Sequence, residues 1–334
     1  MKKLLVILGP TATGKTDLGL DLAKKFNGEL VACDSRQVYQ GLDIGTGKRP
    51  SENSKFEFRN SRLKKLDGRW VVYGVNIWMY DVIDPKKQYN VSDYVKDTNN
   101  VIKNITIRGK LPIIVGGTGL YLKALLGDLP DINIPVDKSL RQKLENLPKD
   151  KLQKKLRQID INKWESMNES DRQNPRRLIR AIEISISSLR APKGRGNLKT
   201  RLLRRFAPRN DVLKIGLTAP REVLYKSVDA RVISRMPGMI AEAESLYEKG
   251  LTIKRMTELG LEYSVLADYL AGKITTKENF VKILQYQIHG YVRRQQTWFK
   301  KEKDINWFNI TDNNLYSRIE NLVREWYDID IKHA

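Results

Sequence analysis

The residues with the clearest chemistry form a glycine-rich loop near the start of the chain. Gly9–Thr16 reads G-P-T-A-T-G-K-T, fits the pattern G-x-x-x-x-G-K-[ST], and follows the apolar run Leu4–Leu8. In such loops backbone N–H groups point at an anion, while the lysine and the dipole of the following helix add positive potential. The pattern therefore predicts a strand, a phosphate-binding loop and a helix. The predicted phosphate-binding residues are Gly9, Pro10, Thr11, Ala12, Thr13, Gly14, Lys15 and Thr16.

A carboxylate follows the next apolar stretch. Asp34 comes directly after Glu29–Cys33 and opens the sequence D-S-R-Q-V-Y. Because ligands bind at the carboxyl ends of parallel strands, we expect Asp34 to lie beside the phosphate loop. Three roles are open to it: holding Mg²⁺ through water, accepting a proton from a nucleophile, or capping a helix together with Ser35. The spacing alone does not choose among these roles.

The elements that must position these residues alternate between strands and helices. Leu18, Leu22 and Phe26 recur every four residues, as in a helix that packs on a sheet. Further apolar runs at Ile113–Val115 and Leu213–Leu217 predict buried strands. This alternation predicts an α/β fold with a P-loop NTPase-like parallel sheet flanked by helices, an inserted helical domain and a helical C-terminal part.

Changes in composition predict three segments, namely a core at 1–129, an inserted and mostly helical domain at 130–207, and a return to the core with C-terminal helices at 208–334. Within the core, the turn signal Asp67-Gly68 predicts a β-hairpin insertion at about 52–78. In the second segment, eight basic residues and no acidic ones lie between 190 and 210, which predicts a basic arm. Long helices are expected at 223–236 and 277–299.

Charge and residue counts narrow the class of protein. The chain of 334 residues carries 61 Lys and Arg against 39 Asp and Glu, a net charge of +22 that predicts a polyanionic partner. One cysteine, Cys33, and two histidines, His289 and His333, exclude an internal disulfide and a Cys/His zinc site. No apolar run approaches the about 18 residues of a membrane span. We therefore expect a cytoplasmic protein that does not enter membranes.

Six blocks of sequence resemble the tRNA dimethylallyltransferases, also called tRNA isopentenyltransferases or the IPP transferase family. They occur in the family's order along nearly the whole chain. The blocks are G-P-T-A-T-G-K-T at 9–16, D-S-R-Q-V-Y at 34–39, G-L-D-I-G-T-G-K at 41–48, V-G-G-T-G-L-Y at 115–121, N-P-R-R-L-I-R-A-I-E at 174–183 and R-R-Q-x-T-W-F at 293–299.

The resemblance implies transfer of a dimethylallyl group from dimethylallyl diphosphate to the exocyclic N6 amine of the tRNA adenosine that is 3′-adjacent to the anticodon. The loop would bind the diphosphate, with Mg²⁺ at Thr16, and one chain would act as a monomer on one tRNA. The implied catalytic residues are Asp34 as general base, Thr11, Lys15 and Arg231. The implied contacts with the anticodon stem-loop are Asp34, Ser35, Arg36, Gln37, Gly117, Thr118, Arg176, Arg177, Arg180, Arg293, Arg294, Gln295 and Lys300.

The chain departs from the family pattern at two places, and three other functions stay open beside the resemblance. Ile77 and Trp78 stand where the family often has a histidine, and Ile288 and His289 stand where it often has Thr-Arg. One alternative is a P-loop nucleotide or small-molecule kinase with an arginine-rich lid. Others are an adenylate isopentenyltransferase that acts on free AMP, ADP or ATP, and a non-catalytic RNA-binding protein with a relic loop.

Overall fold

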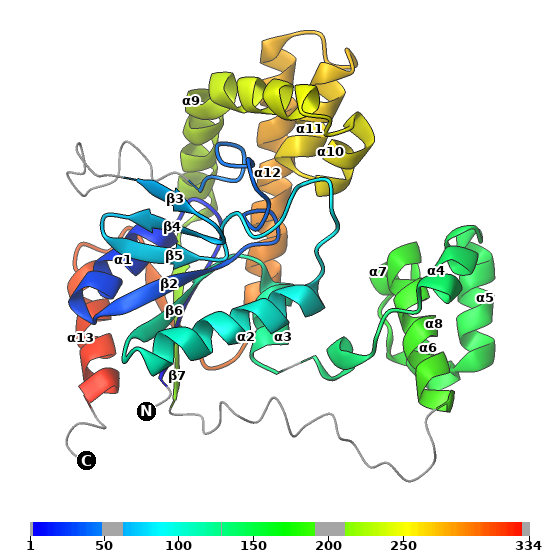
Figure 1. The fold of residues 1–334 in the computed structure, drawn as a ribbon, viewed down its shortest axis with the longest axis horizontal. Coiled ribbons are helices and arrows are strands. Elements are labelled where there is room, and N and C mark those ends of the chain that lie inside the picture. The colour runs from blue at the N-terminus through cyan, green and yellow to red at the C-terminus, as the bar shows by residue number, and fades with distance from the viewer. Residues whose placement is uncertain (1–2, 49–62, 128, 191–210, 329–334) are drawn as a thin grey trace. The chain divides into compact units, whose positions relative to one another are not determined.

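The computed structural model describes residues 3–48, 63–127, 129–190 and 211–328, and Figure 1 shows its elements. The chain divides into two compact units, one formed by Met1–Leu126 with Phe206–Ala334 and the other by Gly127–Arg205. Residues 191–210 of the predicted basic arm and 52–62 of the predicted insertion lie outside the described residues. Within the described part of the chain, no helix is long and apolar enough to cross a membrane.

The first unit is built on a mixed sheet whose described strands follow the order β3-β4-β5-β2-β6-β1-β7-β8. All pairs from β5 to β8 are parallel, and β1 and β2 are buried along their whole length. These near-continuous apolar strands are typical of a sheet covered on both faces. The strands are β1 (Leu4–Leu8), β2 (Gly28–Cys33), β3 (Lys64–Leu66), β4 (Arg69–Val72), β5 (Val75–Trp78), β6 (Leu111–Gly116), β7 (Val212–Thr218) and β8 (Asn306–Asn309).

The predicted turn at Asp67-Gly68 does join two antiparallel strands, with Leu66 paired to Arg69. The strands extend the main sheet, however, because β4 pairs with β5 and β5 pairs in parallel with β2. The sheet is therefore antiparallel at this edge, a feature that the turn signal alone did not indicate. Trp70 on β4 is fully buried, so this edge contributes to the core.

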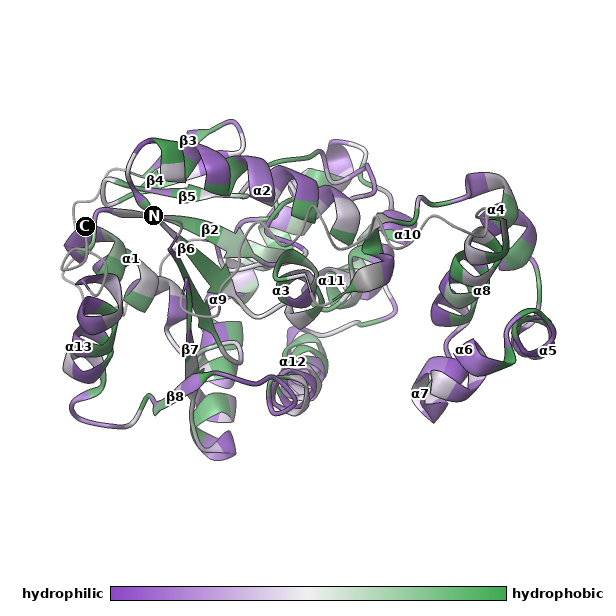
Figure 2. Cartoon of the chain, turned by 90° about the horizontal axis from the view of Figure 1, so that it is seen from below, coloured by the Kyte–Doolittle hydropathy of each residue, from purple (hydrophilic) through white to green (hydrophobic). Residues whose placement is uncertain are grey.

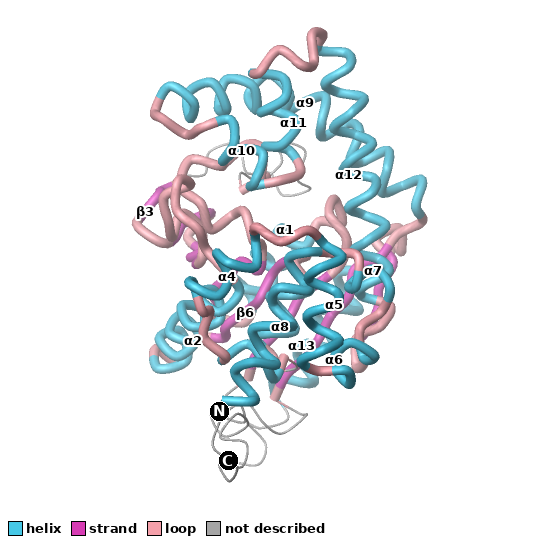
Figure 3. Tube along the Cα trace, turned by 90° about the vertical axis from the view of Figure 1, so that its right-hand side faces the viewer, coloured by secondary structure: helices cyan, strands magenta, loops and turns pink. Residues whose placement is uncertain are grey.

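Helices cover both faces of the sheet. α1 and α13 lie on one face and α2 lies on the other (Figures 1 and 2). α9, α11 and α12 pack together beyond the sheet (Figure 3). The helix predicted at 223–236 is longer and continues through Pro237, whereas that predicted at 277–299 is confirmed. The helices are α1 (Lys15–Lys25), α2 (Val91–Ile107), α3 (Gly119–Leu125), α9 (Arg221–Glu248), α10 (Ile253–Leu259), α11 (Glu262–Leu270), α12 (Lys277–Phe299) and α13 (Leu315–Asp328).

The second unit is helical and has its own apolar core. Leu152, Leu156, Trp164, Leu178 and Ile182 are buried together in it. Its elements are η1 (Pro130–Asn133), α4 (Lys138–Glu145), α5 (Lys149–Ile159), α6 (Ile161–Ser166), α7 (Glu169–Arg172) and α8 (Pro175–Arg190). The predicted α/β class, with a P-loop-like sheet, helices on both faces and an inserted helical part, is confirmed.

Candidate active site

The predicted phosphate loop forms a tight turn between β1 and α1. A Cβ on Gly9 would come within 2.3 Å of the Leu217 carbonyl oxygen on β7, so only glycine fits there. Ala12 and Gly14 have φ values of 66° and 77°, in the left-handed region. The Thr13 hydroxyl donates to the Pro10 carbonyl at 2.9 Å and closes the turn. No side chain caps the start of α1, which leaves backbone N–H groups for an anion.

Lys15 is a cation held against this loop. Its Nζ donates to the Pro10 carbonyl at 2.5 Å and lies 3.5 Å from Thr13 Oγ1. Burial and, to a lesser extent, the nearby Arg231 guanidinium lower the pKa of Lys15 to about 7, although the Asp34 carboxylate opposes both effects. The charged form of Lys15 is therefore destabilised in the ligand-free protein. An anion bound in the loop would restore it.

Arg231 reaches the same loop from α9. Its Nη2 donates to Thr11 Oγ1 at 2.8 Å, and burial together with neighbouring arginines lowers its pKa to about 10. Arg235 lies one turn further along α9. Its Nη1 packs against Gly47, and a Cβ added to that glycine would stand only 2.5 Å from it. Burial also lowers the pKa of Arg235. We did not predict Arg235 from the sequence, although its spacing of four from Arg231 places both on one helix face.

The α9 helix also fixes the loop that contains the 41–48 motif. The Glu242 carboxylate accepts consecutive backbone N–H groups from Asp43 and Ile44 at 2.8 and 2.7 Å, and from Gly45 at 3.1 Å. The Tyr263 hydroxyl donates to the same carboxylate. A single helix thus carries the two arginines and the anchor of this loop.

Asp34 lies at the carboxyl end of β2, half-buried, and its Oδ1 accepts from the Arg36 N–H at 2.9 Å and the Gln37 N–H at 3.4 Å. The helix cap with Ser35 that the sequence left open is not observed, because Asp34 closes a turn and no helix begins there. This anchoring fixes the orientation of the carboxylate. The negative charge of Asp34 also raises the pKa of Lys15, because it favours the charged form of the lysine.

The residues that follow β6 connect the phosphate loop to the segment around Asp34. The Thr118 N–H donates to the Cys33 carbonyl at 3.2 Å, and its hydroxyl accepts from the Ser35 N–H at 3.3 Å. Gln295, from α12, accepts from the Thr11 N–H and donates to the Gly117 carbonyl, both at 2.9 Å. Gln295 is only 5% exposed. The structure therefore brings Gln295, a predicted RNA contact, to the phosphate loop.

The remaining predicted RNA contacts of the first unit divide into two groups. Arg36 forms an ion pair with Glu262 and Gln37 donates to the Thr46 carbonyl at 3.1 Å, so both side chains make contacts within the protein. Arg293 and Arg294 on α12, and Lys300 directly after it, are instead exposed. Arg293 donates to the Tyr225 hydroxyl at 3.0 Å.

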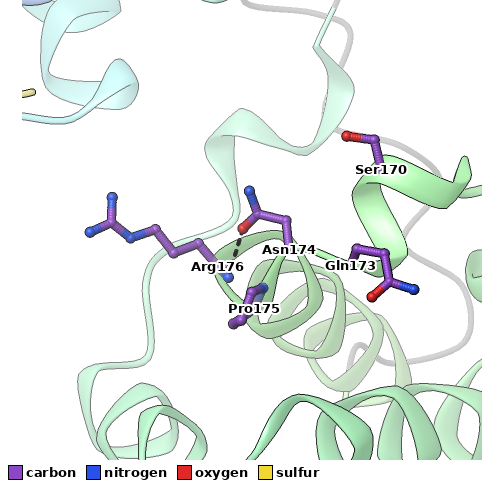
Figure 4. Close-up of a pocket in the computed structure, with 5 residues that line it drawn as sticks. All are labelled: Ser170, Gln173, Asn174, Pro175 and Arg176. Carbon is purple, nitrogen blue, oxygen red and sulfur yellow. Dashed lines mark hydrogen bonds between the residues drawn. The ribbon is translucent and has the colours of Figure 1, made fainter. Parts of the chain in front are cut away.

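The three predicted contacts on α8 of the second unit also differ from one another. Asn174 caps this helix by accepting from the Arg176 N–H at 3.0 Å, beside an open hollow of about 620 Å³ that Figure 4 shows. The Arg176 side chain is exposed and extends away from Ser170 and Gln173. Arg177 is ion-paired with Asp171. Arg180 donates to the carbonyls of Asp131 and Ile134 at 2.9 Å and thus supports its own unit.

The two departures from the family pattern have structural roles. Ile77 is buried, and Trp78 Nε1 donates to Glu29 at 2.7 Å. Arg108 and Lys110 also pair with Glu29, and the pKa of Glu29 lies well below its usual value because these partners outweigh its burial. Ile288 is buried as well.

His289 links α12 to α9. Its Nε2 lies 2.8 Å from Asp229 Oδ1, and its ring stacks on Tyr225 with centroids 3.9 Å apart. This departure therefore contributes a contact between two helices of the site.

Fold and site together define a P-loop α/β protein whose loop lies beside half-buried arginines and a carboxylate at the same sheet edge. A model of the IPP transferase family matches residues 37–302. The tRNA dimethylallyltransferase 2 of Treponema denticola is 38% identical over 309 residues, which are 91% of this chain and 94% of that relative. The tRNA dimethylallyltransferase of Anoxybacillus flavithermus is 34% identical over 98% of this chain and 96% of its own. The chain belongs to the IPP transferase family.

A solved structure supports this assignment. The full-length tRNA isopentenylpyrophosphate transferase from Bacillus halodurans is 31% identical, covers 100% of both chains and gives a TM-score of 0.67. The chain therefore shares its fold with a tRNA isopentenylpyrophosphate transferase over its full length.

Proposed function

We propose that this protein transfers a dimethylallyl group from dimethylallyl diphosphate to the N6 amine of the tRNA adenosine next to the anticodon on its 3′ side. Diphosphate is the other product. The names of the relatives support a tRNA dimethylallyltransferase. The observation that carries the assignment of the site is the convergence of Lys15 and Arg231 on one loop, with Asp34 at the same sheet edge.

The diphosphate would bind at the loop and the start of α1. Lys15, Arg231 and the free N–H groups of α1 supply positive potential to an anion whose charge grows as the allylic carbon–oxygen bond breaks. The Thr11 hydroxyl accepts from Arg231 and would donate its own proton to the oxygen that leaves. This arrangement stabilises the transition state more than the bound substrate.

Magnesium fits the residues present. In the described residues no group of three or more His, Cys, Asp or Glu side chains could hold a metal. Mg²⁺ typically binds through one or two protein oxygens, several waters and substrate phosphates. The Thr16 hydroxyl, in the first turn of α1, is a suitable oxygen for such a site. When bound, the ion would supply further positive charge toward the departing diphosphate.

Asp34 would act as the general base. An adenine amine is a weak nucleophile because its lone pair is delocalised into the ring. As its nitrogen bonds to the allylic carbon and the carbon–oxygen bond breaks, Asp34 accepts a proton from the amine. Oδ1 is anchored by two backbone N–H groups, which orients the carboxylate for this task. The base must leave its stack to reach the site.

The acceptor is proposed to be a polynucleotide. The net charge of +22 and the exposed Arg176, Arg293, Arg294 and Lys300 favour an anticodon stem-loop over free AMP, ADP or ATP. We infer that one chain acts as a monomer on one tRNA in the cytoplasm.

The proposal is tested by incubating the protein with dimethylallyl diphosphate, Mg²⁺ and an anticodon stem-loop, then analysing nuclease digests by mass spectrometry. We expect a dimethylallyl adduct on the adenosine next to the anticodon. Adduct on free AMP but none on the stem-loop would indicate an adenylate isopentenyltransferase. Turnover of the ATP γ-phosphate, with stronger thermal protection by ATP than by dimethylallyl diphosphate, would indicate a kinase.

A further inference from the structure

We propose that Gln295 is a positioning residue for the diphosphate loop and not an RNA contact. This inference rests on the proposed function, because it concerns the loop assigned to the donor. It separates Gln295 from its neighbours Arg293 and Arg294, which share its motif but are exposed.

Both ends of the Gln295 amide are used inside the protein. Oε1 accepts from the Thr11 N–H and Nε2 donates to the Gly117 carbonyl, each at 2.9 Å, and the residue is 5% exposed. The amide therefore connects the phosphate loop after β1 to the tip of β6. A side chain that is buried and hydrogen-bonded within the protein at both its oxygen and its nitrogen has little capacity to contact a nucleic acid.

The glycines of the 115–121 motif make room for this contact. A Cβ on Gly117 would stand 2.2 Å from Gln295 Nε2, and one on Gly119 would stand 2.3 Å from Trp298 Cδ2. Gln295 and Trp298 are three residues apart, so they lie on neighbouring parts of one face of α12. That face packs directly against the two glycines. The glycines thus serve close approach by α12.

The bond to Thr11 has a consequence for the proposed chemistry. The Thr11 backbone is held by Gln295 while its hydroxyl is held by Arg231 at 2.8 Å. Gln295 therefore determines where the Thr11 hydroxyl and the Arg231 guanidinium stand relative to Lys15. Without the amide, the Thr11 N–H and the Gly117 carbonyl would lose their partner, and the loop would relax to satisfy them.

The test compares Gln295→Met, which keeps length and removes both hydrogen bonds, with Gln296→Met, the same change at the next, half-buried position of α12. We expect Gln295→Met to weaken binding of inorganic pyrophosphate about tenfold or more by calorimetry and to raise KM for dimethylallyl diphosphate similarly. Its Kd for the anticodon stem-loop should stay within about twofold. Gln296→Met should bind both ligands like the wild type.

Gly117→Ala gives a second and independent variant, because the new methyl group would displace the Gln295 amide. It should reproduce the loss of pyrophosphate affinity, and the double variant should be little worse than either single one, since both remove the same contact. Gly117→Ala also serves if Gln295→Met does not fold.

Two results would overturn the inference. A weaker stem-loop Kd with unchanged pyrophosphate binding would make Gln295 an RNA contact, and wild-type pyrophosphate affinity in both variants would leave the amide without a role in the loop. Failure of the proposed function looks different. In that case the wild type itself binds no pyrophosphate, or binds it and transfers no prenyl group.

Discussion

The cationic side chains of the two compact units differ in their burial and in their partners. At the phosphate loop, Lys15 and Arg231 are half-buried, and loss of hydration lowers the pKa of each. On α8 of the second unit, Arg176 is exposed, Arg177 is paired with Asp171, and Arg180 binds carbonyls of its own unit. A buried cation whose charge is destabilised gains most from a bound anion, whereas an exposed cation acts through weak and screened attraction.

A third set of cations compensates a buried carboxylate and thereby serves stability. Arg108 and Lys110 pair with the buried Glu29, which lies at the opposite end of β2 from Asp34. There the charges compensate within the protein. At the loop, by contrast, loss of hydration and the charge of Arg231 lower the pKa of Lys15, and Asp34 offsets this only in part. We therefore expect the loop cations to be stabilised by an external anion.

The largest predicted effect concerns Asp34, the carboxylate beside the phosphate loop. Asp34→Asn keeps an oxygen that can accept from the Arg36 N–H but cannot take up the amine proton. We expect kcat to fall about 100-fold or more, with stem-loop affinity little changed. Single-turnover kinetics with labelled donor would measure this. Turnover near that of the wild type would remove Asp34 from the chemistry.

The second prediction concerns Lys15 and pH. Its pKa in the folded protein, about 7, lies below its ordinary value of 10.5. The unfolded state therefore binds more protons between these values, so this group makes the free energy of unfolding rise with pH across that window. Pyrophosphate favours the charged form. Its affinity should thus fall above pH 7, by up to about tenfold per pH unit from this group.

Calorimetry in buffers of different ionisation enthalpy would detect the proton that Lys15 takes up on binding. Lys15→Arg is the control, because arginine remains charged throughout this range. Pyrophosphate titrates too, so the informative quantity is the difference between the two proteins. Equal pH dependence in both would contradict the assignment to Lys15.

The smallest effect should come from the second unit. Arg176→Gln removes an exposed cation, so the slope of log K against log salt for tRNA binding should become less negative by about 0.7 to 0.9. Arg177→Gln should change it less, because Asp171 already compensates Arg177. Fluorescence anisotropy over a salt series would measure both slopes. A larger change in slope for Arg177→Gln than for Arg176→Gln would contradict this prediction.

Local patterns were sufficient to predict the strand, loop and helix around Lys15, the position of Asp34 after β2, and the bounds of α12. Each depends on apolar periodicity or on a motif within a short stretch of chain. The continuation of α9 through Pro237 was not predicted, because proline normally disfavours a helix interior and tertiary packing overrides it here.

The burial of Gln295 could not be predicted from its motif. It stands next to two arginines in sequence, yet successive residues on a helix point about 100° apart, and only the fold decides which direction meets the phosphate loop. Arg36 was predicted as an RNA contact, but its ion pair with Glu262 was not, since that partner is far away in the sequence. The sequence predicts which residues meet at a sheet edge better than which of their side chains remain free.

Because α9 carries both Arg235 and Glu242, the number of residues between them is restricted. Arg235 and Glu242 are seven residues apart, about two helical turns, so both meet their targets only while that spacing is kept. One added or deleted residue between them would rotate Glu242 by about 100° and detach it from the loop at Asp43. Natural insertions should therefore be absent from this stretch and tolerated at the exposed turn of Asp67-Gly68.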